Sequence, residues 1–187
     1  MDPTTSWILH VQERLATPPP RPLQTDAERH AALVALYVDA GQLWVLLSRA
    51  SGAGSGGAVF PSAEVSSSEE AWQAARRAAS TLEVDSERLM PLGELDHVAA
   101  PTGETVVPCV AVVPPPQTDT QDHAGRDQTP LPLVAARSPS LVEERTVQVG
   151  EENVWVRIAH IGPVTIAGAG VEILENLLER VSSTNAG

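Results

Sequence analysis

The charged residues best placed for chemistry are Glu69 and Arg77, which stand eight positions apart on or beside a predicted helix. That helix covers residues 69–82, where alanine and arginine, both good helix formers, predominate. Ser66 and Glu69 have the spacing of a capping box, so helix capping alone accounts for the carboxylate. A third candidate is Arg49, at the end of a predicted strand. It either contacts a ligand anion such as a phosphate or is an ordinary surface arginine.

Other catalytic arrangements lack a residue that they require. The chain contains twelve basic residues, all arginine, and the missing lysine excludes both a Walker phosphate loop and a Schiff-base mechanism. Five histidines are present, without the spacing of metal ligands. Asp96 and His97 are neighbours on a predicted strand, so they face opposite sides and cannot act as a pair. Ser55 lies in a glycine-rich segment that no helix follows, which argues against a nucleophile elbow.

Composition describes an acidic globular protein. The 187 residues suit one domain, and 42% of them are hydrophobic. A net charge of −12 opposes binding to nucleic acid, whose phosphates it would repel. No apolar run is long enough to cross a membrane and no basic leader is visible, so we expect a cytoplasmic protein. Cys109, the single cysteine, lies in an apolar run and is expected to be a buried strand residue.

The hydrophobic pattern predicts an α+β fold within one domain over residues 1–187. Residues 1–22 are expected to hold a helix (4–15) and a proline-rich connector, and residues 114–129 a mobile loop. A glycine-rich loop is expected over 51–57 and a C-terminal helix over 168–181. The expected strands are 30–38 and 42–47, which form a hairpin, and 92–98, 104–113, 134–136, 146–150 and 154–160.

The segment from Phe60 to Leu82 resembles the signature box of Nudix hydrolases. That box reads glycine, five residues, glutamate, seven residues, arginine–glutamate, an apolar residue, any residue, two glutamates, any residue, glycine and an apolar residue. With Ala63 at the first position, Glu69 and Arg77 match without a gap. The three helix glutamates of the family are replaced, by Ala78, Thr81 and Leu82.

The flanking sequence is similar to one branch of that superfamily, the bacterial coenzyme A pyrophosphatase-like proteins. The matching segments are Leu46-Leu47-Ser48-Arg49-Ala50-Ser51, Leu92-Gly93-Glu94-Leu95-Asp96, Thr102-Gly103, Val107-Pro108-Cys109-Val110, Ile166-Ala167-Gly168 and Ile173-Leu174. The resemblance implies the Nudix fold, a mixed β-sheet sandwiched between α-helices. The chain departs from the branch at residues 52–57, where the segment thought to help recognise coenzyme A is shorter and has no arginine.

The replaced glutamates bear directly on activity. Family members hydrolyse diphosphates with the help of Mg²⁺, which requires hard oxygen ligands. Glutamates at i, i+3 and i+4 lie on one helical face, but here that face carries a methyl, a hydroxyl and an isobutyl group. Glu83 lies about 100° further around the helix and cannot replace them. In the family the box arginine orients a box glutamate; beside Ala78 we expect Arg77 to be a solvated helix residue, the alternative being a retained anion contact.

We therefore predict a Nudix-fold protein without hydrolase activity that acts as a binding or interaction module. Its partner would be a nucleotide-like or coenzyme A-like small molecule, or another protein, and a homodimer is left open. No metal or cofactor is expected. The alternative is a Mg²⁺- or Mn²⁺-dependent diphosphate hydrolase acting on coenzyme A or nucleoside diphosphate derivatives, with metal held by outside carboxylates such as Glu64, Glu94 or Glu104. A purely structural subunit is a third reading.

Overall fold

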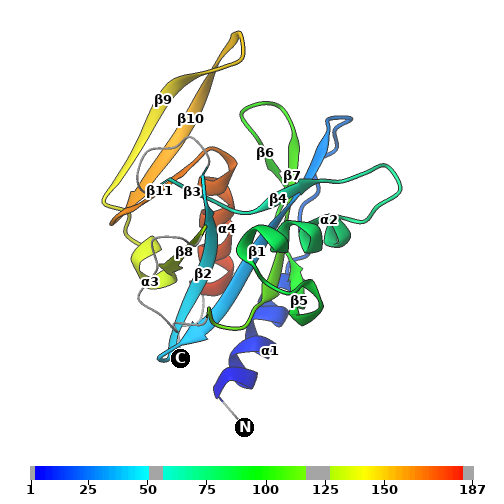
Figure 1. The fold of residues 1–187 in the computed structure, drawn as a ribbon, viewed down its shortest axis with the longest axis vertical. Coiled ribbons are helices and arrows are strands. Elements are labelled where there is room, and N and C mark those ends of the chain that lie inside the picture. The colour runs from blue at the N-terminus through cyan, green and yellow to red at the C-terminus, as the bar shows by residue number, and fades with distance from the viewer. Residues whose placement is uncertain (1–2, 51–56, 117–126, 183–187) are drawn as a thin grey trace.

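A mixed β-sheet forms the centre of the molecule (Figure 1). The computed structural model describes residues 3–50, 57–116 and 127–182. The main path of the sheet runs β3 (Ala58–Val59), β2 (Gln42–Arg49), β1 (Arg29–Asp39), β7 (Thr105–Val112) and β5 (Met90–Glu94). Three further strands attach to this path: β4 (Ser62–Glu64) to β1, β6 (Val98–Ala99) to β7, and β8 (Gln128–Pro132) to β2. The β1–β7 pair is parallel and the other pairs of this sheet are antiparallel, so the expected mixed sheet is confirmed.

Strands β1 and β2 form the predicted hairpin, in which Ala35 pairs with Leu46 and Asp39 with Gln42. Ala40 and Gly41 make the turn between them with positive φ angles of 48° and 75°. Successive residues of a strand face opposite sides, and β1 is buried on both. This central strand therefore divides the hydrophobic core into two parts.

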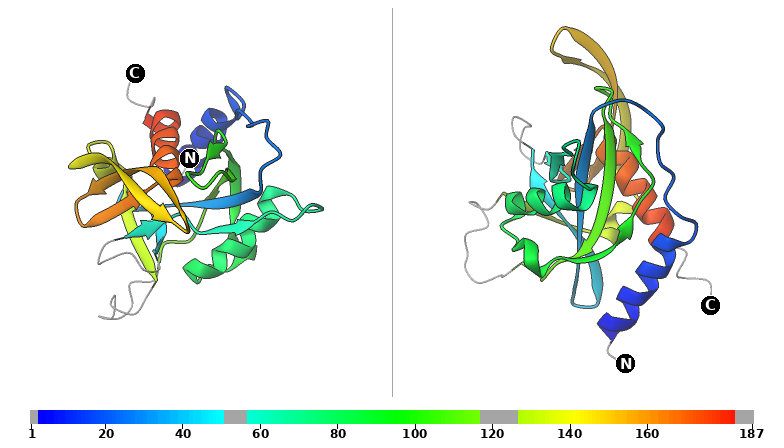
Figure 2. Two further views of the ribbon diagram at one scale, coloured as in Figure 1. Left: turned by 90° about the horizontal axis from the view of Figure 1, so that it is seen from above. Right: turned by 90° about the vertical axis from the view of Figure 1, so that its right-hand side faces the viewer.

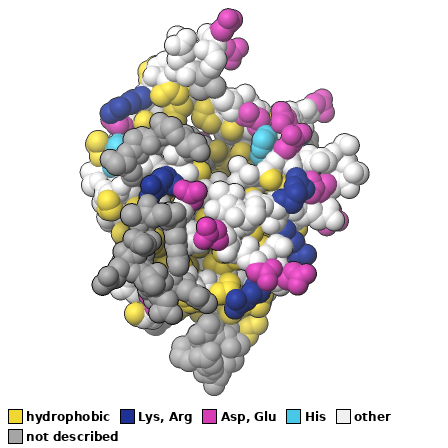
Figure 3. Space-filling model, viewed as in Figure 1, with side chains coloured by type: hydrophobic (Ala, Val, Ile, Leu, Met, Phe, Trp, Pro, Cys, Tyr) yellow, Lys and Arg dark blue, Asp and Glu magenta, His cyan; other side chains and the backbone are white. Residues whose placement is uncertain are grey.

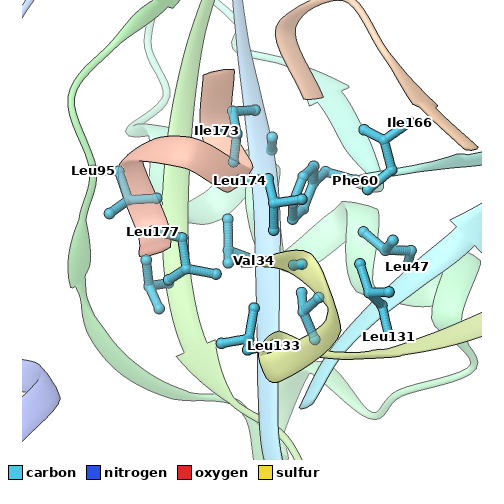
Figure 4. Packing of buried hydrophobic residues seen from close by; sticks show 14 of the residues in the cluster. Val34, Leu47, Phe60, Leu95, Leu131, Leu133, Ile166, Ile173, Leu174 and Leu177 are labelled. Atoms are coloured by element: carbon cyan, nitrogen blue, oxygen red, sulfur yellow. The ribbon is translucent and has the colours of Figure 1, made fainter. Parts of the chain in front are cut away.

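One part of the core lies between the sheet and α2 (Ala71–Ala78), and we call this face the α2 side. It contains Ala31, Leu33, Leu46 and Cys109. The other face, the α4 side, is covered by α4 (Ala169–Ser182) together with α1 (Pro3–Ala16). The helices lie on opposite sides of the sheet in Figure 2, which gives the sandwich that the sequence predicts. Figure 4 shows Val34, Phe60 and Leu174 among the side chains that fill the α4 side.

A smaller antiparallel sheet of β9 (Leu141–Val149), β10 (Glu152–Ile161) and β11 (Val164–Ala167) packs against the α4 side. Its inner end contributes Ala159, Ile161 and Ile166 to the core. The outer end of the β9–β10 hairpin projects away from the body of the molecule (Figures 1 and 2). Trp155, with 72% of its surface exposed, lies on this hairpin.

Helix α1 and the connector after it are held to the rest of the fold by Arg180 of α4. The Arg180 guanidinium donates to the Asp96 carboxylate at 2.9 Å and to the carbonyl oxygens of Pro18 and Arg14. Arg21 adds a second contact to Asp96, with its backbone N–H 3.0 Å from the carboxylate. Because Arg180 is only 9% exposed, these partners compensate a largely buried charge.

Several predicted elements need correction. Residues 134–136, expected as a strand, belong to the short helix α3 (Leu133–Ala136). Residues 128 and 129, expected in a mobile loop, start β8; residues 117–126 of that loop, like residues 51–56, lie outside the described residues. The strand expected over 92–98 is interrupted between β5 and β6, and β9 begins five residues before the expected strand. Within the described ranges, no helix is both long and apolar enough to cross a membrane.

Candidate functional site

The box helix starts later than its sequence predicts. Helix α2 begins at Ala71, and the side-chain oxygen of Gln73 accepts from the backbone N–H of Glu70 at 3.2 Å. Glu69 belongs to the preceding turn: its carboxylate accepts from the N–H of Ser66 at 3.2 Å. The predicted contact between Glu69 and Ser66 therefore exists, but it closes a turn outside the helix. The helical run also ends differently, because residues 79–82 form a 3₁₀ turn.

Glu69 and Arg77, the two charged residues that match the box, are paired with each other. One Arg77 amino group donates to the Glu69 carboxylate, and the other donates to the carbonyl oxygen of Glu64 at 2.6 Å. The Glu69 side chain is 13% exposed and that of Arg77 is 51% exposed. The expectation of a merely solvated Arg77 is therefore wrong. Its partner is an internal carboxylate, so the pair ties α2 to the turn before it and to β4.

The positions of the missing glutamates do not form an open polar face. Ala78 is 3% exposed and Leu82 is fully buried, whereas Thr81 is exposed. Leu82 packs in the α2-side core among Ala75, Ala79 and Leu89. The buried residues of α2, namely Ala71, Ala74, Ala75 and Ala78, recur at the spacing of one helical face, and their small side chains let the helix lie close against the sheet.

Among the described residues, the carboxylates outside these three positions are not grouped as metal ligands either. Glu83 adopts a left-handed backbone conformation with a φ of 51° and is exposed. It borders a surface hollow of about 530 Å³ together with Asp85 and Arg88, so that hollow carries both signs of charge. Within the ranges that the structure describes, no three His, Cys, Asp or Glu side chains are grouped so that they could hold a metal ion. Magnesium, which takes hard oxygen ligands, is therefore not matched by the residues present there.

The carboxylates proposed for a relocated site are divided between the two faces of the sheet. Glu94 pairs with Cys109, a residue of the α2-side core. Glu64 pairs with His30, and Glu104 lines a cavity on the α4 side together with His30. The structure thus brings Glu104 near His30 and leaves Glu94 on the other side.

The remaining sequence candidates are placed as follows. Arg49 is exposed at the end of β2, where its backbone N–H donates to the carbonyl of Asp127 at 2.8 Å. A contact between its guanidinium and a ligand anion stays a prediction. Cys109 is fully buried, as predicted, and burial raises the pKa of its thiol well above the ordinary range. Burial lowers the pKa of His97, and Arg29 lowers it further, against the opposing effects of Glu94 and Asp96.

A cavity of about 340 Å³ lies on the α4 side of the sheet. Its lining comes from strands β1, β3, β4, β7 and β11, from the loop before β7 and from the start of α4: His30, Ala32, Val59, Phe60, Ser62, Ala100, Pro101, Glu104, Val106, Ala167, Gly168, Ala169, Gly170 and Ile173. Most of these residues are apolar. The space-filling view shows a hollow with hydrophobic side chains inside it and acidic side chains with a histidine beside it (Figure 3).

The polar part of this cavity is acidic. His30 Nε2 lies 3.2 Å from a carboxylate oxygen of Glu28. The hydroxyl of Thr102 donates to the Glu104 carboxylate and lowers its pKa, an effect that the Glu104 backbone N–H and nearby His30 reinforce. Glu104 is therefore ionised at neutral pH. Among the residues that the structure describes, no arginine lines the cavity, and Arg49 and Arg77 lie outside its lining.

The cavity was missed at the level of sequence. Strand alternation in the predicted hairpin places His30 and Ala32 on one face. This shared face was the only indication of the cavity in the sequence. What completes the cavity is the pairing of β1 with β4 and β7, together with the approach of α4. The approach of α4 to β1 brings together segments that are more than a hundred residues apart in the chain.

The comparisons with solved structures identify the fold. The chain is similar to a Nudix hydrolase from M. smegmatis, RenU, with a TM-score of 0.52, 18% identity and coverage of 83% of this chain and 86% of that one. It is also similar to a MutT/nudix family protein from Enterococcus faecalis, with a TM-score of 0.52, 16% identity and coverage of 86% and 65%. No family profile and no curated protein matches the sequence. The chain therefore has the α+β Nudix fold.

Proposed function

We propose that this chain is a Nudix-fold protein of the coenzyme A pyrophosphatase-like type that no longer hydrolyses diphosphates and acts as a small-molecule binding module. The observation that carries the proposal is the state of the three box positions. Two of them are buried, Ala78 on α2 and Leu82 in the α2-side core, and the third, Thr81, has no carboxylate. The ungapped match of Glu69 and Arg77 supports the alignment from which those positions are counted.

The chemical consequence follows from the charge of a diphosphate. Hydrolysis requires cations that neutralise its oxygens and activate a water molecule. A methyl, a hydroxyl and a buried isobutyl group cannot bind such cations. Each 1.36 kcal/mol added to the barrier slows a reaction roughly tenfold, so losing the metal contribution of several kcal/mol removes useful turnover.

The binding role rests on the cavity of the α4 side. Its volume of about 340 Å³ lies at the lower end of the range for small-molecule sites. It combines apolar walls, including Phe60 and Val106, with a few polar groups such as Glu104. That combination is typical of a site that encloses the apolar part of a ligand and orients its polar part.

A diphosphatase assay tests the loss of activity. The chain is incubated with coenzyme A and with nucleoside diphosphate derivatives, in the presence of Mg²⁺ or Mn²⁺, and released phosphate-containing products are quantified. We expect no turnover above a protein-free control. Turnover that a chelator abolishes would overturn the proposal and favour the alternative of a hydrolase with a relocated metal site.

Separate titrations with Mg²⁺ and Mn²⁺, followed by calorimetry, provide a second readout. We expect no saturable binding of either cation. Saturable binding that Glu64→Gln or Glu104→Gln removes would place metal at outside carboxylates and overturn the proposal by an independent route. Binding that survives both substitutions and depends on Glu83 would do so as well, at a different site.

A further inference from the structure

The cavity of the α4 side has the wrong charge for a diphosphate. Glu104 is one of its lining residues, and the Glu28 carboxylate lies 3.2 Å from the ring of His30, another lining residue. Over residues 3–50, 57–116 and 127–182 the lining contains no arginine, and the chain contains no lysine. Anionic ligands would therefore meet the negative charge of Glu104 at this cavity, in a protein whose net charge is already −12.

The start of α4 does not reverse this preference. Helix N-termini attract anions through unsatisfied backbone N–H groups. Here the N–H of Gly168 donates to the carbonyl of Arg157 at 2.8 Å, and the N–H of Val171 donates to the carbonyl of Gly168 at 3.0 Å. Glu172 adds a carboxylate to the first turn of the helix. Packing also limits the space, since a side chain at Gly170 would meet Ile166 at 2.8 Å.

The walls of the cavity favour an apolar ligand body. Phe60, Val106 and Ile173 line it alongside alanine and proline residues. Phe60 belongs to the packed core and is 5% exposed, so it offers a fixed aromatic surface. Burial of a hydrocarbon group against such walls is favourable in proportion to the apolar area removed from water.

Because a carboxylate borders an apolar cavity, we propose that this site binds a small organic cation: an amine with a compact hydrocarbon or aromatic body, whose ammonium group contacts Glu104. This inference rests on the proposed binding function and names its ligand class. It departs from the nucleotide-like or coenzyme A-like ligand that the family resemblance implies. The contact is a charge-assisted hydrogen bond, which is stronger than one between neutral groups.

The test uses three probes of similar size and shape: 2-phenylethylamine, 2-phenylethanol and 3-phenylpropionate. Each is titrated into the full chain and followed by calorimetry and by NMR shifts of backbone amides. We expect the amine to bind and to shift residues around the cavity, such as Ala32 and Val106. The alcohol should bind roughly tenfold more weakly, and the carboxylate should not bind.

Matched variants locate the contact. Glu104→Gln keeps the size of the side chain and removes its charge, so it should reduce amine affinity to the level of the alcohol. Glu64→Gln removes a nearby exposed carboxylate that does not line the cavity, and should leave amine affinity within twofold. Ser62→Phe places a large side chain at an exposed lining position and should weaken amine and alcohol alike.

Failure of this inference is distinguishable from failure of the proposed function. Preferential binding of the carboxylate probe, amine binding that Glu104→Gln leaves unchanged, or no binding of any probe would each overturn the assignment of an organic cation. None of these outcomes requires hydrolysis. Metal-dependent turnover of a diphosphate, by contrast, would overturn the loss of activity, whatever the amine titrations show.

Discussion

The two sides of the central sheet have opposite characters at neighbouring residues. On the α2 side, Ala31 and Ala63 lie against a helix whose inward residues are alanines. The helix packs directly against the sheet there. On the α4 side, Ala32 and Ser62 line an open cavity with an acidic border. Both pairs come from adjacent positions on β1 and β4.

The two faces differ in the size of the side chains and in how closely a helix approaches the sheet. On the α2 side, small and apolar residues fill the space between the helix and the sheet, and Leu82 is fully buried there. The α4 side keeps a cavity because α4, the small sheet and the loop before β7 meet there with small residues between them. Under the proposed function, the binding site on the α4 side does not depend on how closely α2 packs against the other side of the sheet.

The largest expected effect comes from placing a charge on the α2 side. Leu82→Glu buries an unpaired carboxylate in the core and should lower the free energy of unfolding by about 4 kcal/mol or more, comparable to the stability of many domains. Thr81→Glu, at the adjacent exposed position, should change it by less than about 0.5 kcal/mol. Denaturant unfolding measures both. A folded Leu82→Glu variant of nearly normal stability would show that this side is open, contrary to the structure.

The next effect concerns the contacts that hold α1 against the α4 side. Arg180→Ala leaves the Asp96 carboxylate without its closest guanidinium and should cost about 3 kcal/mol, because Arg180 is 9% exposed. Arg157→Ala is the matched control: its bidentate pair with Glu175 is solvent-exposed, so about 0.5 kcal/mol is expected. If thermal or denaturant unfolding showed equal losses of stability for the two variants, the difference in burial between Arg180 and Arg157 would be contradicted.

A third prediction uses Tyr37, the single tyrosine, which packs on the α2 side and stacks against Trp44 with ring centroids 6.1 Å apart. Burial, reinforced by Asp39, raises the pKa of Tyr37 from 10.0 to about 12. A pKa raised in the folded state means that stability is retained below pH 10 and decreases as the pH rises from about 10 to 12. The loss should be on the order of 2 kcal/mol.

Phenolate absorbance measures this ionisation directly, because no other tyrosine contributes. Tyr37→Phe should remove the part of the alkaline stability loss that belongs to the phenol. A native-state titration near pH 10 would show that the α2 side admits water at this position. That result would reduce the contrast between the two sides of the sheet.

The smallest effect is expected at the paired box residues. Glu69→Gln weakens one ion pair whose arginine is half exposed, so a change of about 0.5 kcal/mol in the free energy of unfolding is expected. Arg76→Ala, at the exposed helix position beside Arg77, is the control, and its free energy of unfolding should stay nearly unchanged. Neither substitution should alter amine binding on the α4 side. A Glu69→Gln variant that loses ligand binding would connect the two sides and contradict their separation.

Strong periodic patterns made part of this structure predictable. The hairpin of β1 and β2 and the helix α4 follow from long apolar runs and a clear helical stripe, and the burial of Cys109 from its apolar neighbours. Strand β8 escaped prediction because Pro130 and Pro132 interrupt its apolar pattern, and a strand with two prolines is compatible only with the edge of a sheet. Helix α3 was mistaken for a strand because three apolar residues fit either structure.

Only those features of the candidate site that depend on neighbouring residues in the sequence were predictable. The sequence itself shows that positions 78, 81 and 82 carry no glutamate. Their burial is not, because it depends on how closely α2 approaches the sheet. The pairing of Arg77 with Glu69 depends on where the helix begins, a boundary that a capping pattern at Ser66 placed two residues too early.

The Arg180 guanidinium, which is part of α4, contacts the backbone where α1 ends and its connector begins, at Arg14 and Pro18. Elements joined through one buried ion open together rather than separately. Amide hydrogen exchange in α1 and α4 should therefore show a common opening free energy, and Arg180→Ala should lower protection first in α1. A common opening would make the first and last helices one cooperative unit, although 152 residues separate Ala16 from Ala169.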